Sequence, residues 1–130
     1  MPPLSPTRIA DRLLWASRLP DPGDDEADLR FQSDLMDRLI SRGESRRLGR
    51  VEDVEVVHVS FDGDRIEARV QGSRGDTYET RVTLRPRPGH KCSCADWAQN
   101  GLRVGPCKHV LRLGYDWREN VDRKLAVLDF

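Results

Sequence analysis

The chain lacks long hydrophobic runs and has little apolar material with which to build a core. None of its 130 residues lies in an uninterrupted apolar run of 18 or more, and residues 1–20 lack the apolar centre of a signal peptide. We therefore expect no membrane contact and a cytoplasmic location. Hydrophobic residues make up 37% of the sequence and charged residues 34%, which is lean for a domain of this length.

The chain also lacks a net charge, because 22 basic residues balance 22 acidic ones. A total of zero argues against a simple basic nucleic-acid binder. The charges are nevertheless segregated, since residues 21–37 contain seven acids and one arginine, whereas residues 85–112 contain six basic residues and one acid. The second segment predicts a basic face, which the first could mask. The alternative is two solvated faces without a partner.

Cysteine is scarce, and its few positions are informative. The three cysteines are Cys92, Cys94 and Cys107, and His109 follows the last of them. An odd number and a C-x-C spacing too short for an easy bridge argue against a disulfide framework. The pattern C-x-C, twelve residues, C-x-H instead supplies three thiolates and one imidazole, the donor set of a tetrahedral zinc site. Four protein ligands leave no position for a substrate or an activated water, so we predict one structural Zn²⁺ ion.

Catalytic interpretations of the same residues are weaker. Cys107 and His109, two positions apart on a helix, would point away from each other, so a hydrogen-bonded nucleophile and base would not form. The Pro106-Cys107 pair is typical of zinc deaminases, but no histidine here is followed two residues later by the glutamate that those enzymes require. We therefore predict that the chain is not an enzyme and takes no small-molecule substrate.

Hydrophobic periodicity predicts two helices in the first part of the chain. The first runs from an N-cap at Ser5 to Leu19 and ends in the turn residues 20–23. The second covers about residues 25–41, where acids crowd the first turn, and Gly43 follows as a terminator. Its apolar stripe is expected to pack within the molecule; the alternative is a partner-binding arm.

Alternation of apolar residues then predicts three strands. They cover residues 51–61, 66–70 and 78–84. Turns rich in glycine and aspartate join them into an antiparallel meander, and residues 85–89 break the third strand. The G-x-x-G tetrapeptide of the second turn is interpreted as a plain turn rather than the phosphate-clamping loop of a KH domain, because that loop joins helices.

The second ligand pair is predicted to open a helix with an apolar inner side. The positive end of this helix is expected to favour the ionised form of Cys107. Trp97, which lies between the two ligand pairs, is expected to be buried against the same helix. The second ring nitrogen of His109 needs a backbone carbonyl or a carboxylate as its acceptor.

Together these elements predict an α+β fold with N-terminal helices, a three-stranded antiparallel β-meander, a zinc-binding loop and a C-terminal helix. A last short helix or apolar tail over residues 121–130 would cover the sheet or insert into a partner. We assign residues 1–44 to an N-terminal helical segment and residues 45–130 to the zinc finger domain.

The order C-x-C, a variable loop, and then C-K-H followed by apolar helix residues resembles the SWIM zinc finger. This family occurs in proteins associated with bacterial remodelling ATPases, plant transposases and eukaryotic recombination factors. The strand and turn at residues 70–78 and the segment at residues 49–56 extend the resemblance to about residues 45–115. The resemblance implies a zinc-stabilised module that binds DNA or a protein partner and has four metal ligands but no catalytic residues.

We therefore predict a non-enzymatic SWIM module that acts as a protein-interaction adaptor of a DNA-processing machine. The expected partner is a DNA-dependent ATPase or a recombination protein, contacted through the acidic helix and the apolar tail. The alternative is direct DNA binding through the basic face around the zinc site. Lys108 either contacts a phosphate there or offsets the charge of the thiolates. The candidate nucleic-acid-binding residues are Arg85, Arg87, Lys91, Arg103, Lys108 and Arg112.

Overall fold

The computed structural model describes residues 19–100 and 105–128. The helix predicted over residues 5–19 lies outside this part of the chain apart from Leu19, and so do Arg103 and Phe130. None of the described helices is both long enough and apolar enough to span a bilayer.

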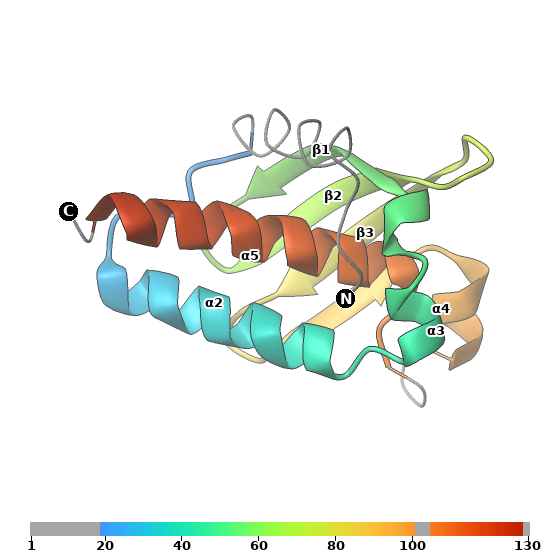
Figure 1. The fold of residues 1–130 in the computed structure, drawn as a ribbon, viewed down its shortest axis with the longest axis horizontal. Helices are drawn as coiled ribbons and strands as arrows, with labels where there is room; N and C mark the ends of the chain where they lie inside the picture. Colours follow the sequence, from blue (N-terminus) through green and yellow to red (C-terminus); the bar gives the residue numbers. More distant parts are fainter. Residues whose placement is uncertain (1–18, 101–104, 129–130) are drawn as a thin grey trace.

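The described residues form an α+β fold, as predicted, with a four-stranded antiparallel sheet in the order β1-β2-β3-β4. The long helices α2 and α5 lie side by side across one face of this sheet (Figure 1). The elements are α2 (Glu26–Ser41), α3 (Ser45–Leu48), the 3₁₀ turn η1 (Val51–Asp53), β1 (Glu55–Phe61), β2 (Arg65–Gln71), β3 (Thr77–Thr83), β4 (Gly89–Cys92), α4 (Ala95–Asn100) and α5 (Lys108–Leu128).

Helix α2 begins where the sequence predicts and packs within the molecule. The Asp25 carboxylate caps it by accepting hydrogen bonds from the backbone amides of Ala27 and Asp28. The apolar stripe of α2 joins the same core as the sheet and α5, so the prediction of intramolecular packing is confirmed. The buried apolar residues of this stripe are Leu29, Leu35, Met36, Leu39 and Ile40.

The sheet differs from the predicted meander at both ends. Residues 51–53 form the turn η1, so β1 begins only at Glu55, and a register shift between Val56 and His58 leaves Val57 40% exposed. A fourth strand, β4, follows the break at residues 85–89 and pairs with β3. The prediction of three strands was wrong on this point because four residues, two of them polar, are too few to show alternation.

Helix α5 is one continuous helix to Leu128, so a separate last helix or tail was a wrong prediction. Val110, Leu113, Trp117, Val121 and Leu125 recur every three or four residues, which keeps one apolar stripe facing the core. Only the end of this helix carries large exposed apolar side chains, those of Val127 at 68% and Leu128 at 40%.

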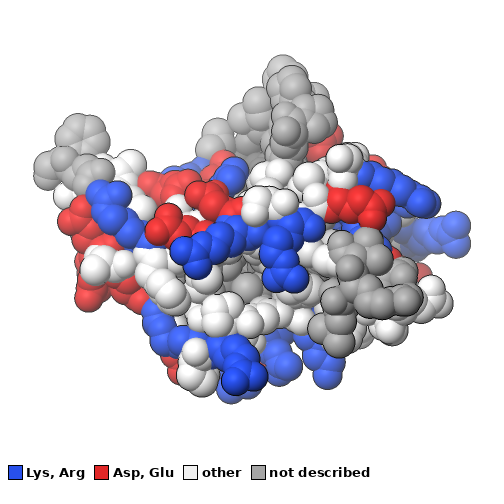
Figure 2. All heavy atoms as spheres, turned by 90° about the horizontal axis from the view of Figure 1, so that it is seen from below, with Lys and Arg blue, Asp and Glu red and all other residues white. Residues whose placement is uncertain are grey.

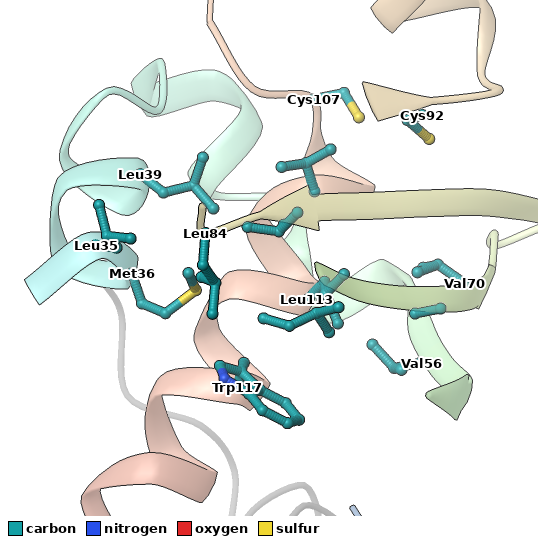
Figure 3. Close-up of a cluster of buried hydrophobic side chains, with 14 of the residues drawn as sticks. Leu35, Met36, Leu39, Val56, Val70, Leu84, Cys92, Cys107, Leu113 and Trp117 are labelled. Carbon is teal, nitrogen blue, oxygen red and sulfur yellow. The ribbon is translucent and has the colours of Figure 1, made fainter. Parts of the chain in front are cut away.

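Trp117 is the largest of the fully buried side chains and lies below Leu113 in the cluster of Figure 3. Its ring contacts Phe61 of β1 at a centroid distance of 4.9 Å, and its indole Nε1–H donates a 2.9 Å hydrogen bond to the side-chain oxygen of Gln32 on α2. The side-chain amide of Gln32 in turn donates to the carbonyl of Pro22. The tryptophan therefore joins both long helices to the sheet with its polar atom satisfied.

Arg112, like Trp117, links separate elements of the fold. Its burial corrects the prediction that it binds nucleic acid. It is 6% exposed, and its guanidinium donates to the carbonyls of Val51 and Val54 and to the carboxylate of Asp116. The side chain therefore fastens η1 to α5 and does not lie on a surface where DNA could contact it. Its five donors suit several fixed acceptors, which explains the presence of a charged residue on the inner side of a helix.

We predict that Arg112→Ala lowers the free energy of unfolding by about 3–5 kcal/mol, because it removes a cation from a buried carboxylate and leaves two carbonyls without their donor. Urea unfolding would measure the change. The matched control is Arg118→Ala, which breaks the solvent-exposed pair with Asp37 and should cost no more than about 1 kcal/mol. Equal losses in the two variants would contradict the role given to Arg112.

Candidate metal centre

The four predicted ligands come together at one end of α5. Cys92 ends β4, Cys94 precedes α4, Cys107 precedes α5, and His109 lies in the first turn of α5. Their ligand atoms all lie within 4.8 Å of one another, and none of the four residues is more than 4% exposed. Figure 3 shows Cys92 and Cys107 beside each other at the margin of the core.

The donor set and its surroundings fit a metal ion. The three cysteines are free thiols, so no disulfide competes for them. The amide of Trp97 donates to Cys94 Sγ at 3.3 Å, and the Thr80 hydroxyl lies 3.5 Å from Cys92 Sγ. Hydrogen bonds of this kind stabilise metal-bound thiolates. In a tetrahedral site with sulfur and nitrogen ligands the donor atoms are about 3.5–4 Å apart, so only a small contraction is needed.

Local pairing places the first two ligands. Thr80 of β3 faces Cys92 of β4 in the antiparallel register, and the Ser93 amide donates to the carbonyl of Glu79. The chain then turns into α4, so that Cys94 Sγ accepts from the amide three residues later. The sequence predicts this ligand pair from its spacing, but Thr80 carries no signal of its role because it is separated from Cys92 by a turn and a strand.

Trp97 anchors this segment, although differently from the prediction. It is half-buried against the core, and its indole Nε1–H donates to His90 Nδ1 at 3.1 Å. Burial, followed by the charge of Arg42, lowers the pKa of His90. His90 therefore stays neutral and its Nδ1 remains an acceptor. The tryptophan thus ties the start of α4 back to β4, rather than only covering α5.

The imidazole of His109 is oriented by its neighbours. Its Nδ1 lies 3.8 Å from Cys107 Sγ, which makes Nδ1 the atom that faces the thiols. The Tyr78 ring lies against it at a centroid distance of 4.4 Å. Its other nitrogen, Nε2, is buried and has no hydrogen-bond partner within the described residues. The backbone carbonyl or carboxylate expected from the sequence is therefore not found there.

The protonation states of Cys92 and Cys107 depend on each other when no metal is bound. Hydrogen bonds from the thiols of Cys107 and Cys94 lower the pKa of Cys92 to about 3. The same hydrogen bonds, made to Cys92 and Cys94, together with burial, raise the pKa of Cys107. The sequence predicts the opposite for Cys107 because it sits at a helix start. The Val110 amide does lower this pKa, but the hydrogen bonds to Cys92 and Cys94 and the burial of the thiol outweigh it.

A bidentate ion pair holds two short helices together beside the metal centre. The Arg47 guanidinium of α3 donates to both carboxylate oxygens of Asp96 on α4, at 2.8 and 2.7 Å. This hydrogen bonding to Asp96 raises the pKa of Arg47. The pair joins two short helices that are 49 residues apart in the sequence. Sequence analysis missed it because neither residue belongs to a recognisable motif.

The predicted nucleic-acid-binding residues do not form one face. Arg85 lies over the Phe31 ring and pairs with Asp28 of α2, at the opposite end of β4 from Cys92. Arg87 and Lys91 are exposed, and Lys108 is half-buried beside His109. Figure 2 shows basic side chains across the middle and lower part of one face, with acidic ones toward its left end and upper margin. The predicted cluster of basic residues around the metal ligands is therefore incomplete, because Arg85 and Arg112 are engaged elsewhere.

We predict that Cys94→Ser abolishes tight metal binding and lowers the thermal unfolding temperature, because one of four buried ligands is replaced by a poorer one. Metal content and differential scanning calorimetry would measure both effects. Ala98→Ser, an exposed change on α4, is the control and should match the wild type. Unchanged thermal stability in Cys94→Ser would contradict a structural role for the ion.

We also predict that metal binding at pH 7 releases protons, including that of Cys107, because its raised pKa keeps this thiol protonated in the metal-free chain. Cys92 should release none, since its lowered pKa leaves it ionised. Metal affinity should therefore rise with pH. Calorimetric titration in two buffers of different ionisation enthalpy would count the protons, and a heat independent of the buffer would contradict this prediction.

Comparison of the chain with protein-family models, with curated proteins and with solved structures found no match. The function is therefore argued below from the residues of the chain itself, and the resemblance to the SWIM zinc finger stays a prediction.

Proposed function

We propose that this chain is a non-catalytic interaction module held in shape by one structural zinc ion. The observation that carries the proposal is the buried quartet of Cys92, Cys94, Cys107 and His109. Three sulfur donors and one nitrogen donor suit zinc better than the oxygen-preferring divalent cations. Four protein ligands complete a tetrahedral shell, so a bound ion would have no position open for a reacting molecule.

Zinc would act here by joining the short segments β4 and α4 to the start of α5. The ligands come from the end of β4, the start of α4 and the start of α5, and α4 is only six residues long. A helix of that length is not stable by itself in water. Zinc binding contributes on the order of 10–16 kcal/mol in zinc-finger peptides, enough to order such a segment.

The partner that we propose is a protein of a DNA-processing machine, such as a DNA-dependent ATPase or a recombination protein. The resemblance to the SWIM finger supports this choice. The exposed Val127 and Leu128 at the end of α5 offer an apolar contact, and the outer side of α2 carries the exposed acids Asp34 and Asp37. The inner side of α2 is used in the core, so the adaptor surface is smaller than the sequence predicts.

Direct DNA binding is the second candidate function. Arg87 and Lys91 favour it, because both are exposed and neither side chain makes an ion pair with another described residue. Exposed cations of this kind bind phosphates without sequence preference.

Native mass spectrometry of the purified chain, with and without a chelator, tests the zinc site. We expect one zinc ion per chain and loss of the folded charge-state distribution when the ion is removed. Substitution with Co²⁺ should give the absorption spectrum of a tetrahedral thiolate complex. Absence of bound metal, or six-coordinate cobalt, would remove the proposal.

The adaptor role is tested by affinity purification from the source cells with the wild type and with Val127→Ser/Leu128→Ser. We expect the double variant to keep its zinc but lose a protein that the wild type retains, because it loses the apolar contact. Val57→Ser, at an exposed apolar residue of β1, is the control. Recovery of identical proteins by all three chains would contradict a partner at this end of α5.

A further inference from the structure

Two surface pockets adjoin the metal centre and share three of their lining residues. The larger, of about 560 Å³, lies between α3, α4 and the start of α5. The smaller, of about 270 Å³, lies between the start of α5 and the turn that joins β2 to β3. Arg50, Lys108 and His109 line both of them. We call these two adjoining pockets together the trough.

The trough has an excess of available positive charge. Five basic and three acidic side chains line it, and two of the acids, Glu44 and Asp96, are already paired with Arg47. The side chains of Arg46, Arg74 and Lys108 make no hydrogen bond or ion pair with any other described residue. Within the part of the chain that the structure describes, the Arg50 side chain makes one ion pair, an exposed contact of 3.6 Å with Asp53.

A buried donor without an acceptor also lines the trough. His109 is 4% exposed, lines both pockets, and has no partner for Nε2 within the described part of the chain. A metal ion on Nδ1 would place the ring proton on Nε2, because a neutral imidazole carries one proton. A buried N–H left without an acceptor is unfavourable, so the site favours a ligand that supplies one.

We propose that the trough binds successive phosphates of a nucleic-acid strand, with one phosphate oxygen accepting from His109 Nε2–H. Arg50 and Lys108 flank that phosphate, while Arg46 and Arg74 lie toward the two ends and contact its neighbours. The proposal rests on the proposed zinc site, because zinc on Nδ1 makes Nε2 a donor. The residues differ from the exposed pair Arg87 and Lys91, so the trough is an alternative to that pair as the location for nucleic acid, and the two locations can be tested against each other.

The shape of the trough favours a strand over a small anion. Two pockets in series, with cations at each end, match a chain of evenly spaced charges better than one isolated phosphate. Tyr78, which lines the smaller pocket, lies against His109 and is not free to stack on a base. We therefore expect binding through the backbone with little preference for sequence.

The competing explanation is that these cations only offset the charge of the centre. Zinc with three thiolates carries a net charge of about −1, and neighbouring basic side chains would reduce it. That explanation predicts that removal of the cations weakens zinc binding and leaves nucleic-acid binding unchanged. The two explanations therefore differ in whether removal of the cations lowers the affinity for zinc or the affinity for nucleic acid.

The test compares two double variants of the zinc-loaded full chain. Arg46→Gln/Arg74→Gln removes two charges from the trough, and Arg87→Gln/Lys91→Gln removes two exposed charges elsewhere. Fluorescence anisotropy with a labelled oligothymidylate of about 16 nucleotides would measure affinity against salt concentration. We expect the log-log slope to become shallower by about 1.4 in the trough variant, since each single-strand phosphate contact contributes about 0.7, and to stay unchanged in the other.

Each other outcome overturns the proposal. Equal losses in both variants would mean diffuse attraction to charge, and loss only in Arg87→Gln/Lys91→Gln would place the nucleic acid on the exposed pair. Weaker zinc binding with unchanged strand binding would assign the cations to the metal centre. Binding of inorganic phosphate without binding of the oligonucleotide would exclude a strand. Zinc content is measured in every sample, so failure of the zinc site is recognised separately.

The histidine contact has its own readout. In the ¹⁵N-labelled zinc-loaded chain, the proton on His109 Nε2 should shift downfield and exchange more slowly with water when the oligonucleotide is added, because it acquires an anionic acceptor. The same signal should not move in Arg46→Gln/Arg74→Gln at that oligonucleotide concentration. An unchanged signal in the wild type, despite strand binding, would remove His109 from the proposal.

Discussion

The position of the first turn of α5 is the constraint on which the rest of the structure depends. That turn supplies His109 and follows directly on Cys107, and the same helix then contributes Leu113 and Trp117 to the core. One rigid element therefore positions half of the ligands and much of the buried apolar surface. Ligand geometry and core packing are consequently set together, and a shift of the helix along the sheet would disturb both.

The other two ligands are held by weaker structure. Strand β4 has four residues, pairs only with β3 and forms one edge of the sheet. Its position is reinforced by side chains, namely Trp97 bonded to His90 and Arg47 bonded to Asp96. An edge strand of this length has few ladder hydrogen bonds with which to resist fraying. A bound ion would connect this edge to the well-anchored start of α5.

Much of this arrangement could be predicted from the sequence, because it follows local rules. The ligand spacing identified all four residues of the centre, and periodicity identified α2 and the strands β2 and β3. The exceptions depend on contacts between distant segments. Strand β4 is too short to show a pattern. Arg112 was interpreted as a surface cation because its acceptors, the carbonyls of Val51 and Val54, lie about sixty residues earlier.

Contacts between distant segments also decide which charged residues lie beside the metal centre. Nearness to the ligands in the sequence suggested Arg85, yet that side chain turns to Asp28 of α2. Arg46 and Arg50, which lie far earlier in the chain, line the pocket beside His109 because α3 and η1 fold back onto the start of α5. Only the tertiary structure decides which of many arginines surround a given atom.

Helix α5 has 21 residues, and at 1.5 Å per residue it measures about 30 Å from its first turn to its last. Figure 1 shows that it runs along most of the long axis of the molecule. The trough and the exposed apolar pair at Val127 and Leu128 therefore lie at opposite ends of the same helix. The helix would hold ligands bound at these two ends about that distance apart, as a spacer between neighbours in a larger assembly.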